Sequence, residues 1–244
     1  MGRCKGVAWS RCALAVLFAL LAITSNLSAD DWEELPHAAP PQTSPGPDAA
    51  PVSTGNPGTF IACGEPARPA RDPVKGIVAQ LDEMYGESFR AYESVAPEVP
   101  HAATGGCIFY NQTELKSLLG NWMGVRDANA VQPMLYAIFA HEFGHLEHGD
   151  VDARPSSREE ARERELNADR FAGYTLGRLG LPRLDPEQVN NYYRAVGDDY
   201  VGAGDNGDHG TSAQRTTALE DGWHRADLGL PEAGSEPAGG LGQP

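Results

Sequence analysis

The chain has 244 residues with a formal net charge of −15 at pH 7, and 41% of its residues are apolar. This length and apolar content are enough for one substantial folded domain. The strongly acidic balance argues against nucleic acid or an anionic membrane surface as the main partner.

Residues 1–29 have the pattern of an export signal. Basic residues precede an uninterrupted apolar run, Ala13–Ile23, and small residues lead up to a cleavage point after Ala29. Because this run is short for a membrane span, we expect a secreted or periplasmic protein. A signal that stays uncleaved and anchors the chain to the membrane is the alternative.

The segment after the signal, residues 30–58, is a mixture of Pro, Ala, Ser, Gly and Thr with few large apolar side chains. Such a composition cannot bury enough surface to offset the entropy of ordering, so it predicts a flexible linker or a pro-region. We expect the folded domain over residues 59–230 and a disordered tail over residues 231–244.

Two cysteines remain once the signal is set aside, Cys63 and Cys107. An even pair in an oxidising compartment predicts a disulfide between them. A metal site built on the two cysteines is the weaker alternative, because neither has a second ligand close by in the sequence.

The remaining pattern predicts a helix-rich α+β domain. Apolar residues at helical spacing indicate an amphipathic helix over residues 73–92. Residues 105–110 indicate a strand, either an edge strand that an extended peptide could join or an internal strand of a small sheet. A short helix or turn is expected over 114–119. Cap residues and spacing predict longer helices over 129–148, 158–179, 185–196 and 211–227.

The predicted helix over 129–148 contains the pattern H-E-x-x-H, from His141 to His145. Residues four apart share one helix face, so the two imidazoles can hold a zinc ion at about 2.0–2.1 Å. Glu142 can then act as the general base that takes a proton from water. The alternative is a pair of histidines on a partly buried helix with an incidental glutamate between them.

Two histidines leave a zinc site incomplete, and a third protein ligand is needed. The class that continues with a glycine and a third histidine is excluded because this chain lacks that continuation. Asp150 and Asp152 follow His145 too closely to fold back easily onto the metal. Glutamates on the next predicted helix are the better candidates, and spacing alone does not separate Glu160, Glu163 and Glu165.

Glu165 has the most favourable surroundings of the three. Ala168 and Ala172 would let its helix approach closely, and Asp169 lies one turn further on the same face. A carboxylate there could accept a hydrogen bond from the distal nitrogen of a ligand histidine and so fix its tautomer.

His141-Glu-Phe-Gly-His145 followed by Glu165-Leu-Asn-Ala-Asp169 resembles the gluzincin metallopeptidases. It is most similar to the family of the CAAX prenyl protease and bacterial periplasmic or membrane zinc peptidases. The resemblance covers residues 107–225 and implies a zincin-like fold with an active-site helix and a small sheet. It also implies that Glu165 is the third zinc ligand and that Asp169 supports a ligand histidine.

A later stretch, from His209 to Arg215 and into the following helix, resembles the downstream block of the same family. The resemblance implies that His209 or Arg215 helps to stabilise the oxyanion of the tetrahedral intermediate. Gly210 stands where the family usually has proline. Without the resemblance, His209 would be a loop histidine with a structural or solvent-facing role.

Together these features predict an exported zinc metalloendopeptidase in which zinc and Glu142 activate the water. We expect a peptide or protein substrate, extended along the strand near Ile108–Tyr110. The alternative function is a catalytically idle zinc protein that serves as a chaperone or assembly factor on a peptidase scaffold. The intact Glu142 favours the enzyme. In a third possibility, residues 30–72 cover the cleft and make the enzyme latent.

Overall fold

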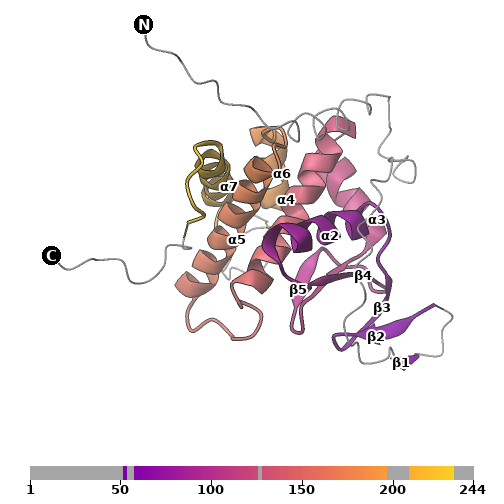
Figure 1. Cartoon of the computed structure of the whole chain (residues 1–244). Coiled ribbons are helices and arrows are strands. Elements are labelled where there is room, and N and C mark those ends of the chain that lie inside the picture. The colour runs from indigo at the N-terminus through magenta and orange to yellow at the C-terminus, as the bar shows by residue number, and fades with distance from the viewer. Residues whose placement is uncertain (1–51, 54–57, 126–127, 197–208, 234–244) are drawn as a thin grey trace, which may run out of the picture.

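The computed structural model describes residues 52–53, 58–125, 128–196 and 209–233. The predicted export signal lies outside these residues, as do most of the predicted linker and tail. The fold is α+β and rich in helix, with a small mixed sheet beside a group of packed helices (Figure 1). No helix in the described ranges combines the length and the apolarity that crossing a bilayer requires.

The described part of the sheet has the strand order β1-β2-β3-β4-β6-β5. Its pairs are antiparallel except for β4 and β6, which run parallel. The strands are β1 Val52–Ser53, β2 Phe60–Ala62, β3 Glu65–Pro69, β4 Arg90–Ser94, β5 His101–Ala103 and β6 Cys107–Tyr110.

Strand β6 is internal, so the prediction that a substrate lies along Ile108–Tyr110 is wrong. Ile108 is paired with Ala91 of β4 on one side and with Ala102 of β5 on the other. All four residues of β6 are buried. The backbone groups that an added strand would need are therefore already used, and β5 is the terminal strand at this edge.

The first long helix is shorter than the sequence predicted. Helix α2 spans Val74–Tyr85 rather than residues 73–92, and the chain goes on to form β4. Gly86 ends the helix in the left-handed region, with φ of 75°. The Asp82 carboxylate then accepts a hydrogen bond from the backbone N–H of Phe89, which holds the turn into the strand.

The later helices begin and end within two residues of the predicted positions. Ser157 caps α5 by accepting a hydrogen bond from the Glu160 N–H, and Thr211 caps α7 in a capping box. The helices are α3 Gln112–Ser117 with a π-helical turn over Leu118–Trp122, α4 Ala128–Glu147, α5 Arg158–Arg178, α6 Pro186–Val196 and α7 Ser212–Asp227.

Helices α5 and α7 approach each other so closely that glycine is required where they cross. A Cβ atom on Gly173 would lie 1.9 Å from the Leu219 carbonyl oxygen, and one on Gly222 would lie 1.9 Å from that of Arg170. On the other side of α5, Gly144 of α4 packs against Phe171. Helix α5 therefore packs closely against α7 on one side and against α4 on the other.

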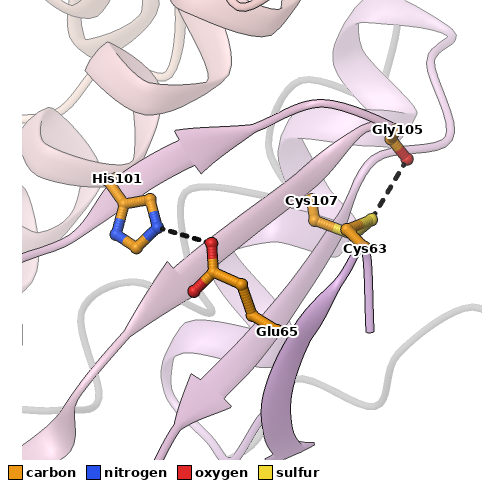
Figure 2. Close-up of a disulfide and its surroundings, with 5 residues drawn as sticks. All are labelled: Cys63, Glu65, His101, Gly105 and Cys107. Carbon is orange, nitrogen blue, oxygen red and sulfur yellow. Dashed lines mark hydrogen bonds and ion pairs between the residues drawn. A yellow bond between two sulfur atoms is a disulfide. The ribbon is translucent and has the colours of Figure 1, made fainter. Parts of the chain in front are cut away.

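The structure contains the disulfide that the sequence predicted. Cys63, in the turn between β2 and β3, is bonded to Cys107 at the start of β6 (Figure 2). The Cys63 sulfur also lies 3.5 Å from the Gly105 carbonyl oxygen. The bond joins the turn between β2 and β3 to β6, which neighbours neither strand in the sheet, and the alternative of a two-cysteine metal site is wrong.

Candidate metal centre

Helices α4 and α5 bring three candidate ligands to one point. The Nε2 atoms of His141 and His145 lie 3.1 Å apart, one turn apart along α4. The two carboxylate oxygens of Glu165, on α5, each lie 3.5 Å from one of these nitrogens. Donors at about 2.0–2.1 Å from a tetrahedral zinc ion are separated by roughly 3.4 Å. The three observed separations fit that donor arrangement.

Asp169 lies one turn after Glu165 on α5 and is fully buried. Its Oδ1 atom is 2.8 Å from Nδ1 of His141. A proton on Nδ1 is held there by the carboxylate, which leaves the lone pair of Nε2 directed toward Glu165. The structure thus places Asp169 where it can set the tautomer and ring orientation of a ligand histidine.

A second carboxylate, whose role the sequence did not predict, supports the other histidine. Oδ2 of Asp150 lies 3.0 Å from Nδ1 of His145. The chain reverses directly after α4 because Gly149 adopts a left-handed conformation with φ of 69°. Asp150 does fold back, then, but toward the distal ring nitrogen rather than toward the metal. The sequence signal for this contact was Gly149, a residue typical of a helix end, followed directly by the carboxylate of Asp150.

The loop that carries Asp150 is held by Arg164, the residue before Glu165. Nη1 of Arg164 donates to the carbonyl oxygens of Asp150 at 2.8 Å and of Ala153 at 2.6 Å. Nη2 donates to the Glu160 carboxylate, also at 2.6 Å. Helix α5 therefore carries the candidate ligand Glu165. Through Arg164 it also holds the backbone of the loop whose Asp150 contacts His145.

Arg215 is buried, with 2% of its surface exposed, and it contacts two of the carboxylates. Its Nε and Nη2 atoms lie 2.8 and 3.0 Å from the two oxygens of Asp169. Nη2 is also 3.3 Å from Oε2 of Glu165. Tyr193 donates its hydroxyl to Asp169 at 2.8 Å, and its ring lies under the guanidinium.

Burial and paired charges shift the pKa values of the candidate ligands. Burial by itself lowers the pKa of His145, but hydrogen bonds to Asp150 and Glu165 outweigh it and raise that pKa to about 10. Burial by itself also lowers the pKa of His141, but the charge of Asp169 and hydrogen bonds to Asp169 and Glu165 together raise it. Burial would raise the pKa of Glu165, yet the two imidazoles hold it well below its ordinary value. A metal ion binding here would displace protons from the imidazoles.

A cavity of about 370 Å³ opens over this group. Glu142 lines it and is buried, and burial raises the pKa of its carboxyl. His209, which is exposed, and Arg215 also line the cavity. His101 of β5 does so too, although the sequence had offered no supporting neighbour for it. The structure therefore brings together every residue of the predicted catalytic and metal-binding set.

No protein-family model matches the chain, and neither the curated proteins nor the solved structures contain a match.

Proposed function

We propose that this protein is a zinc-dependent peptidase with a gluzincin-type centre on a zincin-like domain. The observation that carries the proposal is the set of donor separations among His141, His145 and Glu165. Two imidazoles and one carboxylate form the ligand set of a catalytic zinc site that keeps a position for water or substrate. Carboxylates on both Nδ1 atoms complete the support that such ligands need.

Zinc in this position would act as a Lewis acid that makes water nucleophilic near neutral pH and polarises a peptide carbonyl. Glu142 lies next to His141 in sequence and faces the same cavity. Its carboxylate takes the proton from the attacking water and then delivers it to the leaving amine. Asp169 and Asp150 hold the imidazole rings in place throughout.

The family resemblance offers two groups for stabilising the oxyanion, and the geometry gives them different surroundings. Arg215 is committed to Asp169 and Glu165, so its guanidinium mainly fixes the carboxylates around the metal. His209 stands at the exposed side of the cavity. We assign the contact with the oxyanion to His209 and the positioning of the ligands to Arg215.

The substrate of this site is an extended peptide that lies along β5. This strand is the terminal strand of the described sheet, and His101 and Ala102 line the cavity. An extended chain can add to a free strand edge through backbone hydrogen bonds. The export signal over residues 1–29 is part of the same proposal, with peptides outside the cytoplasm as the substrates.

The test pairs zinc content with hydrolysis in the protein from residue 30 onward. Wild type and Glu142→Gln are compared for bound zinc and for cleavage of casein and of a peptide library. We expect zinc in both proteins and cleavage only in the wild type, because the substitution preserves the ligands and removes the base. Glu147→Gln, an exposed change on the same helix, is the matched control and should cleave normally.

Three other outcomes contradict the proposal in different ways. Protein that does not bind zinc at all removes the metal centre. Zinc in both proteins without cleavage by either favours an idle scaffold or a latent enzyme, and cleavage that survives Glu142→Gln assigns the base elsewhere.

A further inference from the structure

A second group of side chains that could hold a metal ion lies beside the same cavity, and one of its members, His101, lines it. Glu65, Glu98 and His101 each direct one ligand atom to a common region, and these atoms all lie within 4.8 Å of one another. The group combines the start of β3, the loop between β4 and β5, and the first residue of β5. Residues distant in the sequence are thus brought together by the fold.

The ring of His101 is held in a fixed orientation. It stacks on Phe109 with 5.5 Å between ring centroids, and its Nδ1 atom lies 3.4 Å from the Val99 carbonyl oxygen. When Nδ1–H donates to that carbonyl, Nε2 presents a lone pair. This nitrogen faces Oε1 of Glu65 at 3.4 Å (Figure 2). A lone pair facing a carboxylate oxygen needs a cation or a proton between them.

Glu98 provides an independent observation. Its Oε1 atom is buried and has no hydrogen-bond partner among the residues that the structure describes. A buried carboxylate oxygen without a partner is costly, and where one occurs an ion or a water is the usual explanation. The ligand atoms of Glu65 and Glu98 lie within 4.8 Å of each other. Two carboxylates this close repel each other, and a bound cation would relieve the repulsion.

We propose that Glu65, Glu98 and His101 form a second zinc site, separate from the centre on α4 and α5. The donor set of one imidazole and two carboxylates suits zinc better than calcium or magnesium, which take oxygen ligands. The separation of 3.4 Å between His101 and Glu65 is that of two donors on one tetrahedral ion. The side chains of these two residues are 35% and 38% exposed, so this site binds zinc more weakly than the buried centre.

A zinc ion here would act on the wall of the cavity. Val99, Pro100 and His101 line the cavity, and the ion would tie their loop to the start of β3. The disulfide at Cys63 lies two residues from Glu65 and anchors that strand in turn. The second site thus links the rim of the cavity to the strand that follows the disulfide.

Metal-free protein from residue 30 onward, titrated with zinc against a chromogenic chelator, tests this site. We expect one tight and one weaker equivalent in the wild type. Glu65→Gln and Glu98→Gln, which preserve side-chain size, should each lose the weaker equivalent and keep the tight one. His141→Ala should lose the tight equivalent and keep the weaker one. Glu187→Gln, an exposed change on α6, is the control and should bind both.

The two metal proposals fail separately in this experiment, because each equivalent is assigned by its own variants. A wild type that binds a single equivalent, lost in His141→Ala, overturns the second site and leaves the first. A weaker equivalent that survives both glutamine substitutions also overturns it. Amide exchange adds a structural readout: filling the weaker site should slow exchange over residues 95–103 in the wild type and not in Glu98→Gln.

Discussion

The Asp150 carboxylate lies 3.0 Å from Nδ1 of His145, while Nε2 of the same ring faces Glu165. The two nitrogens of one imidazole therefore have separate partners, one from the loop after α4 and one from α5. Asp169 has the same relation to His141. Each candidate histidine ligand is therefore contacted at its Nδ1 atom by a carboxylate, Asp150 from the loop after α4 and Asp169 from α5.

Replacing Asp150 by asparagine should weaken zinc binding by roughly 10–100-fold. The substitution keeps the shape of the side chain but removes the charge that makes His145 a stronger donor. Zinc affinity, measured by competition with a chelator, checks this. Asp152→Asn, an exposed change in the same loop, should bind zinc as the wild type does. Equal affinities in the two variants would contradict a supporting role for Asp150.

Replacing Arg215 by methionine should destabilise the fold by about 3–5 kcal/mol, because it removes the guanidinium that pairs with both oxygens of the buried Asp169 carboxylate. Burial by itself raises the pKa of Asp169, and the charges of Arg215 and His141, together with their hydrogen bonds, more than reverse this. Urea unfolding of the metal-free protein gives the change. The double variant Arg215→Met, Asp169→Asn should be destabilised by less than the sum of the two single changes. Additive losses would show that the two side chains do not depend on each other.

Replacing Gly173 by alanine should destabilise the protein by about 3 kcal/mol or more, since overpacking at a backbone contact cannot be relieved by a side-chain movement. The added Cβ would meet the Leu219 carbonyl at 1.9 Å and force α5 away from α7. Arg215 on α7 would then separate from Asp169, so zinc affinity should fall as well. Gly120→Ala has no atom within 4 Å of the new Cβ and is the control. Thermal unfolding of the wild type, Gly173→Ala and Gly120→Ala measures this, and equal midpoints for the two variants would contradict the prediction.

Asp82 should make stability fall as the pH rises from about 4 to about 7. Burial raises the pKa of this carboxyl to about 7, against an ordinary value of 3.8, although the Phe89 N–H partly opposes the shift. Over that window the folded state keeps the proton while the unfolded state releases it, so the free energy of unfolding decreases with pH. The slope for one proton is at most about 1.4 kcal/mol per pH unit.

Asp82→Asn removes this contribution, so its unfolding free energy should fall less steeply than that of the wild type between these pH values. The difference between the two proteins isolates Asp82, because other titrating groups are common to both. Asp221→Asn, an exposed change on α7, should leave the wild-type slope unchanged. Parallel curves for wild type and Asp82→Asn would contradict the prediction.

The sequence by itself determined the features that depend on neighbours along the chain. Periodicity and caps located the later helices, since Ser157 and Thr211 satisfy N–H groups only a few residues away. The spacing of His141 and His145 placed both imidazoles on one face of α4, because helix geometry fixes residues four apart. The Cys63–Cys107 disulfide followed from the count of cysteines.

Only the tertiary structure decided the features that depend on contacts between distant segments. Spacing in the sequence did not distinguish Glu165 from Glu160 and Glu163 as the third ligand. The packing of α5 on α4 brings the Glu165 carboxylate close to both imidazoles. Sheet pairing made β5 rather than β6 the edge, because strand order is set by long-range hydrogen bonds. The meeting of Glu65, Glu98 and His101 has the same origin: no local pattern records which loop will fold against which strand.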